Sequence, residues 1–310
     1  MFTRSKRSSV ILSASPAART IIGLLTGIIL LGGILTGCIG TSSADYPPPS
    51  GVVEDAVTVP ILMFHDVKTV DGGTWSVSAD KFRKTLVLLL DNGYTPVSFE
   101  RLVDYVDGVG DIPQKPVCIT LDDGYFSNYR NVLPIITELQ VPVTVFMTCK
   151  TIRAEGTTPE TDESLLYKMS TAELEIMEAS PLVEIQSHTY GLHGVNTYYG
   201  EDERDNTLPL KNESESEYKK IFASDCERAE AVLLGVGVRR HTVFSYPSGK
   251  YHEWAEDVLR ERGYRVSVTT NYGRVNTVVK GDPETLYLLG RMNVNDSTSE
   301  EQILKYLEKR

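Results

Sequence analysis

Short apolar segments recur along the chain from residue 58 onwards and alternate with stretches of helical periodicity. The apolar segments are 58–64, 117–121, 143–147, 183–186, 242–246, 265–269 and 287–292. Their lengths of four to seven residues and their many branched and aromatic side chains are typical of buried strands. Strands that alternate with helices favour parallel pairing with right-handed crossovers. The pattern therefore predicts an α/β fold, a distorted and incomplete (β/α)7 barrel.

Capping residues indicate where several helices of this fold begin. The predicted helices cover 79–91, 99–106, 218–234 and 253–262, and another begins after residue 170. Ser78 and Ser98 can cap the first two, and Ser170 with Glu173 forms a capping box. No second change of composition interrupts the chain after the tether described below, so we expect a single domain over 57–310.

The segment 198–217 breaks the alternation of strands and helices. It is rich in acidic and polar residues and has no apolar period. We predict a solvated loop, and an acidic lid or substrate rim is the alternative.

The first 38 residues differ from the rest of the chain. They contain four basic side chains and no acidic one, and an uncharged apolar run covers 20–37, which is typical of a targeting segment. The run ends in Leu35-Thr36-Gly37-Cys38, which resembles the bacterial lipobox, in which the cysteine is acylated. An uncleaved membrane anchor is the alternative, because about 20 apolar residues span a bilayer. Residues 39–56, polar and proline-rich, are predicted to be a tether. We expect an extracytoplasmic lipoprotein of a bacterium, held at the membrane.

The charge and the cysteines exclude two classes of protein. The net charge is −11, and it becomes −15 without the first 38 residues, which carry four basic side chains and no acid. Such a surface is unsuited to nucleic acid, which rewards clustered Lys and Arg. The remaining cysteines are Cys118, Cys149 and Cys226, an odd number that argues against a disulfide framework, although one pair stays open. We expect the first two to be buried small hydrophobes.

Two predicted strands end in residues that bind metals. Asp122 and Asp123 follow segment 117–121, and His188 and His193 follow segment 183–186. Acidic pairs are common in turns and histidines on surfaces, but ligands at the ends of two strands are the layout of an α/β active site. One Asp with two His suits a catalytic divalent metal, because three protein ligands leave a position open for water. The other carboxylate is then free to deprotonate that water.

The local geometry of both motifs is constrained. Adjacent residues of an extended segment point to opposite sides, so both carboxylates reach one cavity only if the chain turns after Leu121, which Gly124 permits. On a helix, the five-residue spacing of His188 and His193 would separate the side chains by about 140°. A loop is therefore expected to carry them.

These motifs resemble those of the polysaccharide deacetylases of carbohydrate esterase family four, the NodB homology domain, over about 59–294. The matching segments are Thr120-Leu121-Asp122-Asp123-Gly124, Ser187 to His193, and Phe244-Ser245-Tyr246-Pro247-Ser248-Gly249. The resemblance implies that Asp122 is the general base and that Asp123, His188 and His193 hold the metal. Zn²⁺ is the expected metal, with Co²⁺, Ni²⁺ and Mn²⁺ as alternatives. The long histidine spacing resembles the branch that contains exopolysaccharide poly-N-acetylglucosamine deacetylases.

The chain departs from the family pattern at the oxyanion and base-orienting positions. An arginine usually opens the third motif, where Phe244 or Ser245 stands here. A backbone N–H near Ser248, after Pro247, is the expected oxyanion donor. Arg291 is our candidate for orienting Asp122, although an exposed arginine at a strand end would look the same.

A second departure concerns the general acid, because no histidine follows His252. His65 ends the first predicted strand, and the exopolysaccharide branch resembles this arrangement. His65 is therefore the candidate acid, with a structural histidine as the alternative, and Asp66 either orients it or caps the next turn.

Tyrosines accompany the motifs. Tyr125 and Tyr190 are expected to line a glycan groove, although tyrosines at barrel rims are also packing residues. Tyr246 adjoins the expected oxyanion site and is a candidate for substrate contact, but for it and Tyr251 the choice between groove and packing stays open.

The sequence thus favours a monomeric, metal-dependent enzyme whose partners are an acetylated glycan polymer and a membrane. The expected reaction is removal of N-acetyl groups from an extracellular N-acetylglucosamine polysaccharide, either an exopolysaccharide or peptidoglycan. An O-acetyl polysaccharide esterase and a non-catalytic glycan-binding lipoprotein of the same fold are the alternatives. A calcium-binding domain is disfavoured, because calcium prefers oxygen ligands and has no use for two histidines.

Overall fold

The computed structural model describes residues 55–69, 73–154, 167–194, 204, 206–238 and 240–309. The predicted targeting segment with Cys38, all but the last two residues of the predicted tether, and part of the segment 198–217 lie outside the described residues. Among the described helices, none combines the length and the apolar character needed to cross a bilayer.

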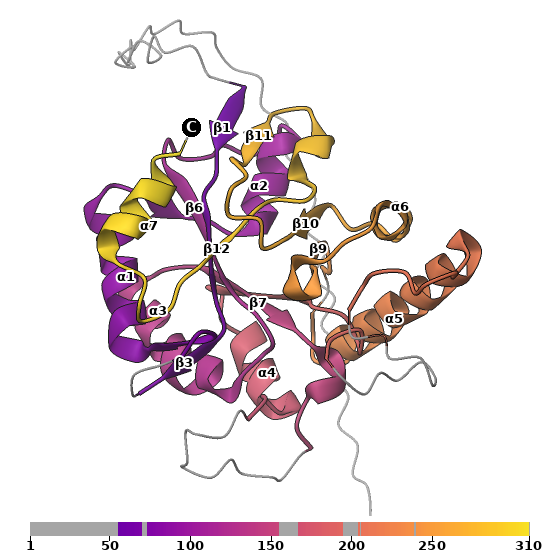
Figure 1. Ribbon diagram of the computed structural model, residues 1–310. Helices are drawn as coiled ribbons and strands as arrows, with labels where there is room; N and C mark the ends of the chain where they lie inside the picture. The colour runs from indigo at the N-terminus through magenta and orange to yellow at the C-terminus, as the bar shows by residue number, and fades with distance from the viewer. Residues whose placement is uncertain are drawn as a thin grey trace, which may run out of the picture. The chain divides into compact units, whose positions relative to one another are not determined.

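A curled parallel sheet forms the centre of the domain (Figure 1). Its strand order is β10-β9-β8-β7-β6-β2-β12, and β5 pairs with β6 beside this path. The strands are β2 (Ile61–Phe64), β5 (Thr95–Pro96), β6 (Pro116–Leu121), β7 (Val143–Met147), β8 (Val183–Ser187), β9 (Val243–Ser245), β10 (Val266–Val268) and β12 (Met292–Asn293). A single bridge between Val268 and Leu289 brings the segment before β12 against β10. The predicted incomplete barrel is confirmed, and each of the seven predicted segments contributes to one of its strands.

Both faces of the sheet are covered by hydrophobic clusters, because successive side chains of a strand point to opposite faces and both sets are apolar. On β6, Ile119 and Leu121 belong to a large cluster that also contains residues of the surrounding helices, whereas Cys118 belongs to a second cluster with Phe146 and Val266. All six residues of β6 and all five of β7 are buried. Continuous apolar runs of this kind are what a doubly covered parallel sheet requires. The three cysteines after residue 54 are buried and free, so no disulfide forms among them.

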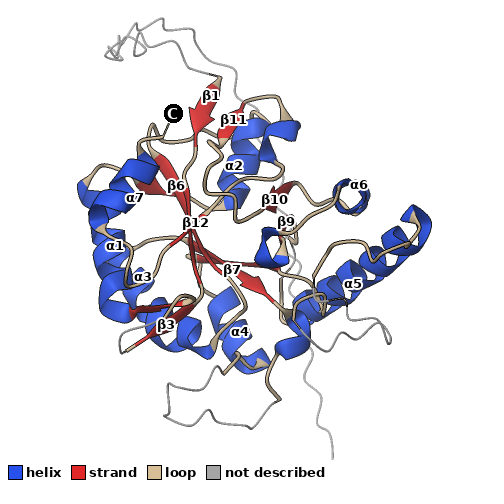
Figure 2. Ribbon diagram, in the orientation of Figure 1, coloured by secondary structure: helices blue, strands red, loops and turns tan. Residues whose placement is uncertain are grey.

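Helices surround the sheet (Figure 2). They are α1 (Ala79–Asp91), α2 (Phe99–Val106), α3 (Leu133–Leu139), α4 (Thr171–Glu178), α5 (Glu215–Gly235), α6 (Glu253–Glu261) and α7 (Glu300–Leu307). Short turns of other helix types are η1 (Asn128–Val132), η2 (Cys149–Thr151), η3 (Pro247–Gly249) and η4 (Pro283–Leu286). The predicted caps of α1, α2 and α4 are all made.

Two small sheets flank the barrel. β1 (Ala56–Thr58) pairs antiparallel with β11 (Thr277–Val279), and β3 (Asp66–Lys68) pairs parallel with β4 (Ser76–Ser78). Ala56, the last residue of the predicted tether, is therefore already part of a strand. The chain is anchored one residue earlier than its composition indicated.

The described part of 198–217 is only partly the solvated loop that the sequence predicted, with residues 211, 212 and 214–217 exposed. Arg204 and Thr207 are buried, Arg204 forms an ion pair with Glu213, and the Thr207 hydroxyl donates to the Lys250 carbonyl. Helix α5 begins at Glu215, with a capping box from Ser214, instead of at residue 218. These contacts could not be predicted from the acidic composition, because the charged and polar residues that form ion pairs and helix caps are also typical of solvated loops.

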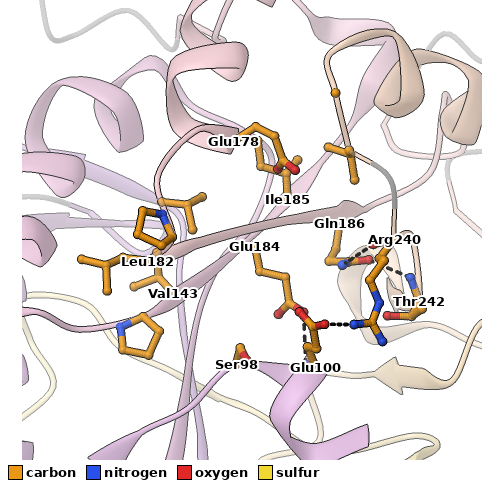
Figure 3. A pocket seen from close by; sticks show the side chains of 15 residues that line it. Ser98, Glu100, Val143, Glu178, Leu182, Glu184, Ile185, Gln186, Arg240 and Thr242 are labelled. Carbon is orange, nitrogen blue, oxygen red and sulfur yellow. Dashed lines mark hydrogen bonds and ion pairs between the residues drawn. The ribbon is translucent and has the colours of Figure 1, made fainter. Parts of the chain in front are cut away.

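The amino ends of β7 and β8 carry a partly buried polar cluster that joins the sheet to α2 (Figure 3). Glu184 accepts hydrogen bonds from the N–H groups of Phe99 and Glu100 and from the Thr144 hydroxyl. The carboxylate thus satisfies two of the free N–H groups at the start of α2. Gln186 likewise bonds the Arg240 carbonyl and the N–H groups of Thr242 and Val243.

Candidate active site

A turn after β6 brings two neighbouring carboxylates to one cavity. Asp123 adopts a left-handed conformation with φ of 72°, so Asp122 and Asp123 do not alternate as they would in a strand. Gly124 also has positive φ, and a Cβ there would lie 2.0 Å from the Met147 sulfur. The turn predicted from the glycine is present, and close packing against β7 leaves no room for a side chain.

The cavity lies at the carboxyl ends of the strands and has a volume of about 670 Å³. Its lining includes His65, Asp122, Asp123, His188, His193 and Ser248. These residues come from β2, β6, β8 and η3 or from the turns that follow them. The fold therefore gathers in one place most of the side chains that the sequence singled out.

Three of these residues form a cluster of metal-ligating atoms. One ligand atom from each of Asp123, His188 and His193 lies within 4.8 Å of the other two. Asp123 Oδ1 is 2.9 Å from His193 Nε2 and 3.6 Å from His188 Nε2. This oxygen is buried and lacks a hydrogen bond of good geometry. A buried anionic oxygen facing two imidazole nitrogens is the environment that a divalent cation would complete.

The protonation state of His188 suits a ligand. Its Nδ1 lies 2.8 Å from the Ser245 carbonyl oxygen, which can only accept, so Nδ1 carries the hydrogen and Nε2 keeps its lone pair. Burial lowers the pKa of His188 to about 4, so the ring is neutral at physiological pH. Burial alone would raise the pKa of Asp123, but His193, Lys168 and His188 outweigh it and hold that pKa well below its usual range.

A buried carboxylate of helix α5 holds the loop between the two histidines. Asp225 accepts hydrogen bonds from the N–H groups of Tyr190 at 2.8 Å and Gly191 at 2.9 Å. Both amides lie between His188 and His193, so the loop predicted for the histidine spacing is fixed from outside the motif. Nothing in the local sequence points to Asp225, because it follows Tyr190 by 35 residues and belongs to another element.

Asp122 is paired with Arg291 and takes no part in the three-residue cluster. The two terminal nitrogens of Arg291 each donate to one Asp122 oxygen at 2.7 Å, and both side chains are buried. Arg291 also donates to Ser245 Oγ, Thr120 Oγ1 and the Thr269 carbonyl. Burial would raise the pKa of Asp122, but Arg291 and His188 reverse the effect and lower it. The arginine is thus not an exposed strand-end residue but lies against Asp122.

His65 lies at the end of β2 with its ring edge-on to Trp75, at a centroid distance of 5.0 Å. Its Nδ1 is buried and has no hydrogen-bond partner among the described residues. Burial lowers the pKa of His65 in spite of the nearby carboxylates. Asp66 does not orient it: Asp66 accepts a hydrogen bond from Ser127 at 2.6 Å and pairs with Lys68.

The third motif reaches the cavity through Ser248 only. Ser248 lines it with φ of 55°, whereas Pro247 is buried and does not. The expectation that Tyr246 contacts substrate is not supported, because its side chain is fully buried and donates to Glu256 at 2.7 Å. Neighbours in a strand face opposite ways, and Ser245 takes the side that faces Asp122.

The tyrosines expected to line a groove differ in position. Tyr125 lines the cavity, and the Lys168 amine lies 3.4 Å from its ring centroid. Tyr190 packs against the main hydrophobic cluster and Arg228 and does not line the cavity. Two aromatic residues that the sequence reading missed, Trp75 and Tyr272, do line it. Both lie in turns of mostly polar residues, so an isolated aromatic side chain was the only feature of the sequence that could have identified them as cavity residues.

Several known proteins are similar to this chain in sequence or in fold. The YxkH protein of Bacillus subtilis is 25% identical over 256 residues, which cover 82% of this chain and 78% of that protein. The poly-beta-1,6-N-acetyl-D-glucosamine N-deacetylase of Escherichia coli K12 is 27% identical over 280 residues, 82% of this chain but only 40% of that enzyme. This chain therefore matches less than half the length of the Escherichia coli enzyme. IcaB of Ammonifex degensii shares the fold, with a TM-score of 0.65, 23% identity and coverage of 82% of this chain and 98% of that one.

The sequence profile described as polysaccharide deacetylase matches residues 110–267, about half of the chain. The matched segment contains the acidic pair, the two histidines and Ser248, whereas His65 and Arg291 lie outside it. With the cavity and the barrel already in place, the match shows that this chain is an enzyme of the polysaccharide deacetylase family.

Proposed function

We propose that this protein is a metal-dependent hydrolase that removes N-acetyl groups from an extracellular N-acetylglucosamine polysaccharide. The observation that carries the proposal is the division of labour between the two neighbouring acids. Asp123 faces two imidazole nitrogens, while both oxygens of Asp122 accept from Arg291 and one of them lies 3.8 Å from His188 Nε2. The name of the Escherichia coli relative, a poly-beta-1,6-N-acetyl-D-glucosamine N-deacetylase, supports the choice of substrate.

Asp123, His188 and His193 would hold the metal, and their mixed oxygen and nitrogen donors suit zinc. Such an ion lowers the pKa of a bound water and polarises the amide carbonyl of the substrate. The neutral state of His188 and the strongly acidic carboxyl of Asp123 mean that neither must lose a proton before binding at neutral pH.

Asp122 is the proposed general base. Its two oxygens are held by Arg291 in a bidentate pair, which keeps the carboxylate ionised and fixes its plane toward the cavity. Ser245 supports the same arrangement, because its hydroxyl accepts from Arg291 and its carbonyl binds His188. One strand end thus aligns the base and a metal ligand together.

The remaining proton transfer is assigned to His65. The oxygen of the attacking water bonds to the amide carbon while its proton passes to Asp122. The carbon–nitrogen bond then breaks, and the departing amine takes a proton from the imidazolium form of His65, which the lowered pKa makes a stronger acid. His65 lines the same cavity as Asp122, and no described protein group bonds its Nδ1. The N–H of the left-handed Ser248 is the proposed donor to the tetrahedral oxyanion.

The location is proposed on the evidence of the leader sequence. The lipobox-like Leu35-Thr36-Gly37-Cys38 would attach the protein to a membrane outside the cytoplasm, where such polymers accumulate. Metabolic labelling with a palmitate analogue tests this placement, and Cys38→Ser should abolish incorporation.

A panel of acetylated polymers tests the reaction. We expect full-length protein to release acetate from poly-β-1,6-N-acetylglucosamine and to expose one free amine per acetate. Preferential release from O-acetylated xylan would support the esterase alternative instead. Binding of the polymer with no acetate from any substrate, in the presence of zinc, would support the glycan-binding alternative.

A further inference from the structure

Two large aromatic side chains are exposed at the rim of the catalytic cavity. Trp75 is 58% exposed and Tyr272 is 64% exposed, and both line the cavity. Among the described residues, Tyr251, at 45%, is the other exposed aromatic, and it does not line the cavity. Exposed apolar surface that gathers beside a cavity indicates a binding site.

The turn that carries Trp75 is held by β12 and the residues that follow it. Trp75 lies in the turn between β3 and β4, and its carbonyl accepts from the Asp66 N–H at 3.3 Å. The preceding carbonyl, that of Thr74, accepts from the side-chain amides of Asn293 and Asn295, each at 3.2 Å. The indole therefore occupies a defined position beside the proposed acid, His65.

Tyr272 is held from the other side of the same segment. It lies in the turn after β10, and a Cβ on Gly290 would lie 2.0 Å from the carbonyl oxygen of the adjacent Asn271. The turn is therefore packed directly against the residue before Arg291. Lys309 donates to the Tyr272 carbonyl at 2.8 Å and lies 5.2 Å from the ring centroid.

The two rings thus project from turns on opposite sides of the segment 289–293. Val268 bridges Leu289 on one side, and β2 pairs with β12 on the other. An elongated ligand that crosses this segment would meet one ring on each side of it, and Arg291, within the segment, holds Asp122 in the same cavity. Neither ring carries a charge, so they suit a neutral ligand with apolar faces, which the C–H faces of pyranose rings provide.

We propose that Trp75 and Tyr272 bind the sugars on either side of the residue that is deacetylated, so that the enzyme recognises a polymer within its chain. The inference rests on the proposed function, because it takes the cavity to be the deacetylation site. The two residues would determine how strongly the enzyme prefers long glycan substrates over short ones, and they would take no part in the chemical step.

Chain-length dependence tests the inference. Full-length Trp75→Ala and Tyr272→Ala should each lower kcat/KM for a β-1,6-N-acetylglucosamine pentamer by about tenfold, mainly through KM. Hydrolysis of a small aryl acetate, which is too short to span the two rings, should fall much less than hydrolysis of the pentamer in each variant. Trp75→Phe should restore most of the pentamer rate, and Tyr251→Ala is the matched control with no change. Equal losses on both substrates, or no loss on the pentamer, would overturn the inference.

A binding measurement separates this inference from the proposed reaction. Pentamer affinity is measured by calorimetry on the Asp122→Asn protein, which should not turn the ligand over, with and without each rim substitution. If wild type releases no acetate but binding still weakens about tenfold in both rim variants, the reaction fails and the sugar site stands. If acetate is released and binding is unaffected by both substitutions, the reaction stands and the sugar site is refuted.

Discussion

Replacement of Asp225 by Asn tests whether the histidine loop is positioned from helix α5. The carboxylate accepts hydrogen bonds from the N–H groups of Tyr190 and Gly191 in a fully buried site. An amide offers one oxygen, and its NH₂ group would face the second N–H. One bond to a charged group is lost, worth about 1.5–3 kcal/mol, and a buried N–H is left without an acceptor at a cost of about 1–3 kcal/mol.

The total of about 2.5–6 kcal/mol divides between folding and metal affinity, because the loop is ordered both by packing and by the ion that its histidines would hold. Loss of a group that orients metal ligands typically weakens binding about 10- to 100-fold. We therefore expect a zinc dissociation constant 10- to 100-fold higher for Asp225→Asn, measured by competition with a chromophoric chelator. The melting temperature of the metal-free protein should fall as well.

Asp257→Asn is the matched control. Asp257 lies on α6, is largely exposed and pairs with Lys219 on the surface, so the same substitution there should leave zinc affinity unchanged. If Asp225→Asn binds zinc as tightly as wild type while its apo form is destabilised, Asp225 stabilises the fold without positioning the site. Unchanged affinity and unchanged melting would contradict the hydrogen-bond argument altogether.

Three further substitutions probe other parts of the structure. Arg291→Gln should lower the deacetylation rate at least about 100-fold by freeing the base Asp122, while zinc affinity, measured by chelator competition, stays within about threefold; a parallel loss of zinc would refute separate roles. His65→Ala should lower the rate about 100-fold with zinc content unchanged by elemental analysis, and retention of full activity would remove His65 from the mechanism. Burial raises the pKa of Glu184 to about 7, above its unfolded value, so its contribution to stability is present at low pH and is lost as the pH rises through 7. Urea unfolding of wild type and Glu184→Gln should accordingly show the wild-type advantage shrinking by about 3 kcal/mol between pH 5 and pH 8, and a constant difference would contradict the raised pKa.

The positions of the strands along the chain and the types of residue at their ends were predictable because both depend on local patterns. Apolar runs mark buried strands whatever surrounds them, and parallel strands present their carboxyl ends at one edge. The sheet therefore brings the residues after β6 and after β8 to the same edge, on either side of β7. The sequence predicted that the chain turns after Leu121, which Gly124 permits. It did not predict that Asp123 itself adopts the left-handed conformation that separates the two acids.

Contacts between distant elements were not predictable in the same way. Asp225 acts on the histidine loop across 35 residues, and Trp75 reaches the cavity because Asn293 and Asn295 hold its turn. Tyr246 was misjudged for a different reason. A motif identifies which residues matter but not which of two alternating neighbours faces the cavity, and Ser245 took that side.

Asp122 is proposed to be a base set apart from the metal ligands, in an enzyme that deacetylates an N-acetylglucosamine polymer. Acetate release from poly-β-1,6-N-acetylglucosamine by zinc-loaded full-length wild type and Asp122→Asn tests it most directly, with zinc content measured on the same samples. We expect the variant to keep its zinc and to lose at least about 1,000-fold in rate. Acetate release by Asp122→Asn at the wild-type rate, or no release by the zinc-loaded wild type, would contradict the claim.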